Sequence, residues 1–559
     1  MVFYCFNLIY NHYNRLLINL YFFSIIDIVK IRKRVKKWEK ITPGGGVTYS
    51  KGFTLIELLA VIVILAIIAL IATPIVLDII EDSKNSSIRE SANMYKSAAE
   101  NAIATSAMND GLEDGTYIID NKGNLKYKDK EIKVDIKNYN FESGILVIEQ
   151  GQIKDIKLIQ NEKVTTGKEL NKIDKWDGKT IKEVTADSNG IYHITKASEL
   201  AWVAQKVNSG ETFAGKTISL DASLDLNNKE WTPIGAGKTN DTYNSFGGTF
   251  EGNNNVIKNL SINKSIEDSE ENRNLGLFAV INSGIARNLI IINSKVVGFS
   301  SVSVFCAAIA NSTINNIIVL NSTINSNKLS GIVIGYSTRS NLSNLYSYSS
   351  EITASDIYIG GVIGEIMYSS LDNAYSNSAI YNNGELRLSG TGGIVGGIIK
   401  ESKANNLISR ASIISNKVSG VGGITGQFQQ ASTLTNSVSF AKVFGVNYVG
   451  GVIGVNSGTY GVNILDNIKS YAEVQGSGED IGGVIGYLSA GEHNFSNIYS
   501  KSSVKGKDKV GGIIGGFVEN NATTLNYKNV ISESTIDGET NVGDLWGYID
   551  SNSIINEIN

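Results

Sequence analysis

Proline and cysteine are scarce in this chain of 559 residues, which has three prolines and two cysteines, Cys5 and Cys306. Its 57 glycines therefore occur without the abundant proline that marks collagen-like chains and proline-rich linkers. Two cysteines cannot provide a disulfide framework. The fold must be held together by packing.

Histidine and excess positive charge are also lacking. The three histidines, His12, His193 and His493, are too few for a repeated metal site. Fifty basic and 54 acidic residues give a net charge of −4, without the basic excess of nucleic-acid-binding proteins. We therefore expect no cofactor, no metal and no nucleic-acid partner.

A long apolar run lies near the N-terminus. Leu58–Leu77 contains no charged residue and, as a helix, would measure about 30 Å, the thickness of a bilayer core. This predicts a transmembrane segment. Glu57 directly precedes the run, and a carboxylate at the edge of an apolar span is costly in lipid unless it has a partner.

The residues around Glu57 supply a reason for its position. Lys51-Gly52-Phe53-Thr54-Leu55-Ile56-Glu57 resembles the processing motif of type IV prepilins. The resemblance implies cleavage by a prepilin peptidase after Gly52 and N-methylation of the new terminus at Phe53. It also implies that Glu57 pairs with the terminal amine of a neighbouring pilin subunit, so that two buried charges satisfy one another.

The resemblance extends to Met108. Pro74 lies where pilins often carry a helix-perturbing proline, and it would remove one backbone hydrogen bond. Beyond Leu77, apolar residues recur at spacings of three and four, which predicts an amphipathic continuation of the same helix. We expect one helix from Phe53 to about Met108, with its first half in the membrane and later in the pilus core.

Residues 1–52 form the expected leader, for which two interpretations remain open. One is a genuine long leader with a basic cytoplasmic flank. In the other, which we prefer, Val47 is a GTG start codon and Gly44–Gly46 encode a ribosome-binding site, so that the leader begins at Val47.

Residues 112–170 alternate between apolar and polar side chains in short runs bounded by Gly, Asn or Asp. The expected strands are 116–119, 132–136, 144–148 and 153–159. Together they predict a small antiparallel sheet packed on the helix, as in pilin heads.

A second helix is expected from Thr195, as its N-cap, to about Asn208, with an apolar face closed by Gly210. Strand-like segments follow at 217–220, 231–235, 248–252 and 259–262. This block resembles the entry segment of bacterial surface β-helices, in which a helix covers the open end of a solenoid.

From Gly276 onward a glycine-rich motif recurs, typified by Gly360-Gly361-Val362-Ile363-Gly364. From Gly335 to Gly547 the last glycines of successive copies are 29, 32, 30, 28, 32, 29 and 32 residues apart. A period near thirty predicts a solenoid, because propeller blades need about forty residues and no leucine-rich consensus is present. The pattern resembles the GLUG repeat of bacterial adhesins.

We therefore expect a right-handed parallel β-helix of about ten coils, with one coil per repeat and asparagine-rich turns stacked as ladders. A polysaccharide-cleaving β-helix would need carboxylates converging over adjacent coils. The acidic residues are scattered, and no two neighbouring repeats place them at matching positions, so we expect no enzyme. The carboxylates weighed are Glu365, Asp372, Asp466, Glu479 and Asp480.

Exposed aromatic residues could stack on sugars, although strand packing is the commoner role of such side chains. The tyrosines in question are Tyr346, Tyr368, Tyr375, Tyr460 and Tyr499.

The expected fold class is α+β, with a long pilin helix and small antiparallel sheet before a β-helix. The domains are 1–52 (leader), 53–110 (helix), 111–185 (β head), 186–265 (cap and entry strands) and 266–559 (repeats). We expect a minor type IV pilin, at the tip or at a sparse position in the filament, that binds a surface, a cell or a glycan. It lies first in the cytoplasmic membrane and then on the extracellular pilus. A secretion or competence pseudopilin and a membrane-anchored glycan-processing enzyme are the alternatives.

Overall fold

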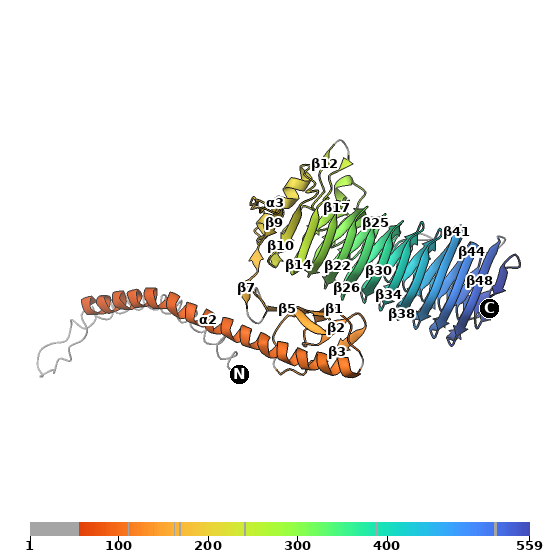
Figure 1. The fold of residues 1–559 in the computed structure, drawn as a ribbon, viewed down its shortest axis with the longest axis horizontal. Coiled ribbons are helices and arrows are strands. Elements are labelled where there is room, and N and C mark those ends of the chain that lie inside the picture. The colour runs from red at the N-terminus through yellow and green to blue at the C-terminus, as the bar shows by residue number, and fades with distance from the viewer. Residues whose placement is uncertain are drawn as a thin grey trace, which may run out of the picture. The chain divides into compact units, whose positions relative to one another are not determined.

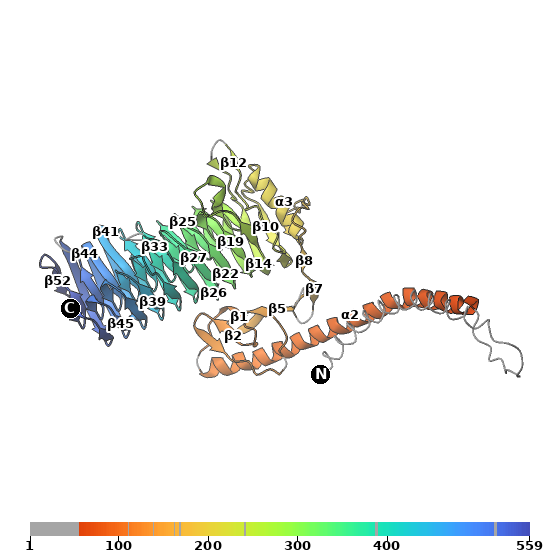
Figure 2. The ribbon, with the colours of Figure 1, turned by 180° about the vertical axis from the view of Figure 1, so that it is seen from behind.

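The structure is a computed structural model (Figures 1 and 2). It describes residues 55–109, 111–137, 139–160, 163–166, 169–239, 242–385, 390–518 and 522–558. The expected leader and the processing residues Gly52 and Phe53 lie outside this part of the chain. Two compact units are present, Met1–Ser83 and Lys84–Asn559.

Helix α2 comprises the described residues Leu55–Asn109, and the expected start at Phe53 lies outside the described part of the chain. In the second unit its buried residues Ala92, Tyr95, Ala99 and Ile103 recur every three or four positions, as an amphipathic helix requires. The Tyr95 hydroxyl donates a hydrogen bond to the carbonyl of Gly123 at 2.8 Å, which fixes the helix to the turn after the first strand.

Within the part of the chain that the structure describes, no helix is long and apolar enough to cross a bilayer.

An antiparallel sheet of seven strands covers the buried face of α2, in the order β3-β2-β1-β4-β5-β6-β7. The predicted strand at 132–136 is wrong: β3 ends at Ile132, and the residues after it are irregular. The strands are β1 (Gly115–Ile119), β2 (Leu125–Tyr127), β3 (Lys130–Ile132), β4 (Ser143–Glu149), β5 (Gln152–Gln160), β6 (Lys163–Thr165) and β7 (Leu170–Lys172).

Helix α3 (Ala197–Asn208) covers the first coil of the solenoid. Thr195 is not its N-cap, contrary to the prediction; Lys196 holds that position. Instead, the Glu199 carboxylate reaches back and accepts hydrogen bonds from the backbone N–H groups of Thr195 and Lys196 at 2.8 and 3.0 Å. The free N–H groups before the helix are thereby satisfied from its third residue.

The cap and entry strands precede the regular coils. Residues 231–235, predicted as a strand, form only one isolated bridge, at Ile234. The elements here are β8 (Asp174–Lys175), β9 (Ile191–Ile194), β10 (Thr217–Leu220), β11 (Leu224–Asp225), β12 (Lys238–Thr239), β13 (Thr242–Tyr243) and the 3-10 turn η1 (Glu270–Asn272).

The rest of the chain is a parallel β-solenoid of about 12 turns, in which each strand pairs with its counterpart one coil later (Figures 1 and 2). Each regular coil contributes to four strand ladders, numbered 1 to 4 in chain order. Ladder 1 holds the motif glycines in β24 (Ser330–Gly331), β28 (Ile359–Gly360), β32 (Thr391–Gly392), β36 (Val421–Gly422), β40 (Val449–Gly450), β43 (Glu479–Gly482), β46 (Asp508–Gly511) and β50 (Thr540–Gly543), after the pair β16 (Arg273–Leu275) and β20 (Ser300–Val302).

Ladders 2 and 3 follow ladder 1 in each coil, and two long strands belong to both. Ladder 2 comprises β17 (Phe278–Asn282), β21 (Cys306–Ala310), β25 (Ile334–Thr338), β29 (Ile363–Met367), β33 (Val395–Ile399), β37 (Thr425–Gln429), β41 (Ile453–Ser470), β44 (Ile485–Ser500), β47 (Ile514–Phe517) and β51 (Trp546–Tyr548). Ladder 3 comprises β14 (Thr249–Lys258), β18 (Ile285–Ile292), β22 (Thr313–Leu320), β26 (Asn341–Tyr348), β30 (Ser370–Ser376), β34 (Lys403–Ser409), β38 (Thr433–Ser439), β41, β44, β48 (Thr523–Ser532) and β52 (Ile554–Glu557).

Ladder 4 closes each coil with ten short strands. They are β15 (Ser261–Asn263), β19 (Lys295–Val297), β23 (Thr323–Asn325), β27 (Glu351–Ala354), β31 (Ala379–Asn382), β35 (Ser412–Ile414), β39 (Lys442–Gly445), β42 (Glu473–Gly476), β45 (Ser503–Lys505) and β49 (Thr535–Asp537).

The motif glycines permit close approach of backbones inside the solenoid. A Cβ atom on Gly361 would lie 2.1 Å from the carbonyl oxygen of Gly393 in the next coil. The neighbouring Val362 and Ile363 are fully buried in one continuous apolar core. The repeat therefore encodes a narrow interior in which any side chain at Gly361 would collide with backbone.

Asparagines do stack between coils, chiefly within ladder 3, with a further pair, Asn311 and Asn282, at the turn after ladder 2. Strand pairing skips Asn316 and Asn344, both of which have positive φ angles, so each strand bends at its asparagine. Side-chain amides then bond along the stack, as from Asn467 to Asn436 at 2.8 Å. The bent positions are Asn288, Asn316, Asn344, Asn373, Asn406, Asn436, Asn467, Asn497 and Asn529.

The antiparallel sheet and the solenoid share a hydrophobic cluster within the second unit. Ladder 3 turns apolar residues outward against the sheet, among them Ile318, Tyr346 and Tyr375, which are in register. The hydroxyls of Tyr127 and Tyr346 lie 3.3 Å apart, and the Tyr348 hydroxyl accepts a hydrogen bond from the Lys128 N–H at 3.1 Å. The outer face of ladder 3 is thus an internal packing surface at these coils.

Candidate functional site

The predicted processing site lies at the start of the chain. Glu57 and Pro74 fall within α2, but their side chains are not among those that the structure describes. The pairing of Glu57 with a neighbouring subunit and the effect of Pro74 stay predictions, as do cleavage after Gly52 and methylation at Phe53.

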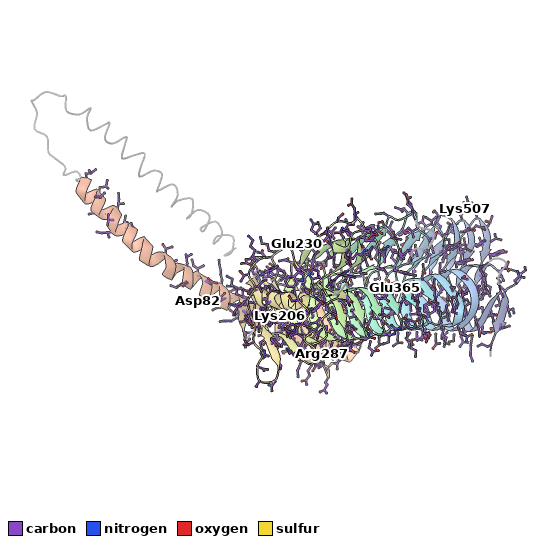
Figure 3. All side chains as sticks on the ribbon, turned by 90° about the horizontal axis from the view of Figure 1, so that it is seen from above. Asp82, Lys206, Glu230, Arg287, Glu365 and Lys507 are labelled. Carbon is purple, nitrogen blue, oxygen red and sulfur yellow. The ribbon has the colours of Figure 1, made fainter. Side chains whose placement is uncertain are left out.

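The solenoid places a second candidate site on the outer face of ladder 2, where strand geometry separates inward from outward residues. Ile363 and Ile366 point into the apolar core, whereas Glu365 occupies an outward position. In register with Glu365 are Tyr336 one coil before it and Gly397 one coil after it. Figure 3 shows Glu365 about midway along the solenoid.

Glu365 is an outward carboxylate that nevertheless has only 6% of its surface exposed. Among the described residues its side chain makes no hydrogen bond or ion pair. Burial raises its pKa to about 7, and the nearby charge of Lys400 opposes the rise. An acid that is about half ionised near neutral pH on a surface strand is a candidate functional group.

Tyr358 lies beside Glu365 and is held in an unusual backbone conformation, with φ at 56°. Its ring occupies the space left by Gly397, where a Cβ atom would come within 2.7 Å of the ring. The Tyr358 hydroxyl donates to Oε1 of Gln427 at 3.3 Å, and Gln429 donates to the same oxygen at 2.8 Å. Burial raises the pKa of Tyr358 to about 12, so the phenol stays protonated.

A cation and a second ring border this group. The Arg339 guanidinium lies 5.1 Å from the centroid of the Tyr368 ring, and 43% of the Tyr368 surface is exposed. We name the whole group the Glu365 patch; it comprises Tyr336, Arg339, Tyr358, Glu365, Tyr368, Lys400, Gln427 and Gln429.

The other carboxylates weighed from the sequence are engaged elsewhere. Asp372 and Asp466 belong to one column on ladder 3, where Asp372 accepts from Asn405 at 2.7 Å and Asp466 from Ser496 at 2.6 Å. Hydrogen bonds from Ser496 and Asn497 lower the pKa of Asp466. These acids are ordinary members of the polar stack.

We expected no two neighbouring repeats to place carboxylates at matching positions, and this expectation was wrong. Glu479 and Asp508 occupy matching positions in β43 and β46. Each has a partner: Glu479 lies 3.4 Å from the Lys509 ammonium, and Asp508 accepts from Thr540 and Asn541. Asp480 is buried beside Gly516, where a Cβ atom would strike its carboxylate.

The tyrosines divide into two groups. Tyr346 and Tyr375 are buried against the antiparallel sheet and so cannot receive a sugar. Tyr368 and Tyr460 are exposed, and the half-buried Tyr499 donates to Glu533 at 2.8 Å. Sequence reasoning missed Tyr336 and Tyr358; the ladder 2 register and the glycine at 397 are the signals that could have found them.

The remaining reactive groups have local partners. His193 bonds to Asp221 at 2.6 Å, which raises its pKa, whereas His493 is buried and burial lowers its pKa to about 4. Burial raises the pKa of the Cys306 thiol, so it stays protonated. Among the described residues no group of three His, Cys, Asp or Glu side chains could hold a metal ion.

The fold and site define a class: a parallel β-solenoid, joined to an N-terminal helix and small antiparallel sheet, with a polar and aromatic patch on one outer face. The family model for the prokaryotic N-terminal methylation motif matches residues 48–73. The chain therefore has a pilin-like N-terminus followed by a β-helix domain, which fits a surface-exposed protein.

One curated relative is similar over a short stretch. Halomucin of Haloquadratum walsbyi (strain DSM 16790 / HBSQ001) is 37% identical over 95 residues, which is 17% of this chain and 1% of halomucin. The chain thus matches only a very small part of that protein's length. No solved structure matches the chain.

Proposed function

We propose that this protein is a minor type IV pilin, located at the tip or sparsely along the filament, whose β-helix attaches the pilus to a surface, a cell or a glycan. The observation that carries the proposal is the methylation motif at residues 48–73 in a chain that continues into a solenoid of about 12 turns. So large a domain favours a tip or sparse position over regular packing along a filament.

In this proposal α2 is the pilin helix, held in the cytoplasmic membrane by Leu58–Leu77 before assembly and in the filament core afterwards. The motif implies processing by a prepilin peptidase and assembly with other pilins. The solenoid is the displayed part, outside the cell. Its right-handed sense follows from the strong preference of parallel strand connections for that hand.

The proposal includes a binding role without catalysis. A glycan-cleaving enzyme on this scaffold would need a second carboxyl group near the first. Among the described residues of the Glu365 patch, Glu365 is the one carboxylate. We therefore place adhesion above enzymatic glycan processing.

The first experiment is intact mass measurement and N-terminal sequencing of protein sheared from its native cells. An N-methylated Phe53 would support prepilin processing and filament assembly. A full-length chain that stays in the membrane fraction would contradict the pilin part of the proposal, and the β-helix would then be a tethered surface domain. Loss of cell attachment on deletion of residues 266–559, with pili still formed, would support the adhesive role.

A further inference from the structure

We propose that the Glu365 patch binds an uncharged saccharide chain lying along the solenoid axis. The inference rests on the proposed adhesive function and adds the site and the class of ligand. Three features carry it: a largely buried carboxylate to which no described residue donates, a tyrosine ring placed beside it over Gly397, and in-register residues that bring polar and aromatic groups together over four coils.

The unpaired carboxylate is the first feature. Glu365 is 94% buried by surface area, with 6% exposed, and none of the described residues donates a hydrogen bond to it. Its oxygens keep some contact with solvent, so a ligand can reach them. A saccharide hydroxyl can donate to Glu365 there, which a chain of the same shape without hydroxyls cannot do.

The placement of the Tyr358 ring is the second feature. In eight successive coils, the residue two positions before the first motif glycine of ladder 1 has a positive φ angle. Six of these eight residues are not glycine, and Tyr448 is one of them, so this conformation is common to the coils. Particular to Tyr358 is the space that Gly397 leaves for its ring, beside Glu365. The result is a ring fixed beside Glu365.

The ladder register supplies the third feature. Tyr336, Glu365, Gly397 and Gln427 are successive partners on ladder 2, so they extend over about 14 Å at the strand spacing of about 4.8 Å. Aromatic surface with a few placed hydrogen-bonding groups is the usual composition of small-molecule sites. An extended saccharide chain matches this site, because its successive sugars can meet successive coils along the solenoid axis.

The charges favour an uncharged ligand. The cation of Lys400 lies close enough to act on the opposite charge of Glu365, so the pair has no field of one sign that would select a polyanion or a polycation. The titratable groups facing Glu365 are Tyr336 on β25, Tyr358 before β28 and Lys400 after β33. Burial raises the pKa of both tyrosines, so neither ionises near neutral pH.

Binding should depend on pH in one direction. Hydroxyl donors favour the ionised carboxylate, and burial has raised the pKa of Glu365 to about 7. A ligand that prefers the ionised form therefore binds more tightly at pH 8 than at pH 6. Glu365→Gln cannot ionise and should bind with the same affinity at both pH values.

The experiment is isothermal titration of the full mature chain with four neutral hexasaccharides, built from glucose, galactose, mannose or N-acetylglucosamine. Heparin serves as the polyanion for comparison. We expect at least one hexasaccharide to bind, and Tyr358→Ala to lower its affinity at least tenfold. Gly397→Ala should also weaken binding, because the new methyl group displaces the Tyr358 ring without removing it.

A matched control is Tyr471→Ala, which removes an exposed tyrosine that is stacked on Phe440 on the ladder 3 side. It should bind like the unsubstituted chain, and all variants are first checked for unchanged unfolding midpoints. The proposal is overturned if no hexasaccharide binds, if Tyr358→Ala binds normally, or if heparin alone binds. An unprocessed N-terminus together with normal saccharide binding would instead contradict the pilin proposal and leave this site standing.

Discussion

The outer faces of ladders 2 and 3 use the same residue type in opposite ways. On ladder 3, Tyr346 and Tyr375 are buried against the antiparallel sheet with the rest of that cluster. Over the outer face of ladder 2, Tyr336 of β25 and Tyr358, which precedes β28, are half-buried around a carboxylate that the described residues leave unpaired. The position of a tyrosine on the outer face of a solenoid therefore does not determine its role. The tyrosine is packed where another element covers that ladder, and it can contact a ligand where none does.

The largest effect is expected where the ladder 3 face is covered. Tyr346→Ala should lower the free energy of unfolding by about 3 to 5 kcal/mol, because it removes a buried ring and its hydrogen bonds to Tyr127 and Asn373. Urea denaturation measures this. The matched variant Tyr368→Ala, on the exposed ladder 2 face, should change stability by about 0.5 kcal/mol or less. Equal effects would remove the distinction between the faces.

The next effect concerns Glu365 and pH. Its pKa is about 7 in the fold against a usual 4.5, so between these values the folded state binds more protons than the unfolded state. Its contribution therefore becomes less favourable as pH rises from about 4.5 through 7, by roughly 3 kcal/mol in total. Urea midpoints of Glu365→Gln and the unsubstituted chain should diverge between pH 5 and pH 8, with the variant more stable at pH 8. Parallel pH profiles would contradict the raised pKa.

A smaller effect is expected from the asparagine stack of ladder 3. Asn436 has a φ angle of 50°, donates to Asn405 and accepts from Asn467, both at 2.8 Å. Asn436→Ala should cost about 1 to 3 kcal/mol, from left-handed strain and lost hydrogen bonds. Asn436→Gly removes the same hydrogen bonds without the strain. Its thermal unfolding midpoint should therefore lie between those of the unsubstituted chain and Asn436→Ala. A glycine variant less stable than the alanine variant would show that conformation is not the cause.

The smallest effect is expected at the exposed pairs of ladder 4. Lys505 and Asp537 lie 3.0 Å apart on neighbouring strands, but their side chains are 62% and 67% exposed. Lys505→Ala should change the free energy of unfolding by about 0.5 kcal/mol or less, because water screens such pairs. A loss above about 1 kcal/mol in urea denaturation would mean that these pairs hold the coils together.

The sequence predicted the solenoid because its signal is local and repeated. A glycine such as Gly361 recurs wherever one backbone must approach the next, and apolar residues beside it fill a narrow core. It also predicted the amphipathic second half of α2, since a spacing of three and four persists there. Errors arose where an alternative partner exists, as when Glu199 rather than Thr195 satisfied the start of α3.

The processing motif and the coil repeat were thus determined by the sequence itself, because each depends on residues close together or on a regular period. The roles of the outward side chains were decided only by the tertiary structure. Tyr346 is buried because a sheet whose Tyr127 lies 219 residues earlier in the sequence packs over it. Glu365 is desolvated because Tyr358 and its neighbours come together from adjacent coils. Burial of an outward residue depends on contacts that no local pattern records, and the chemistry of the patch follows from that burial.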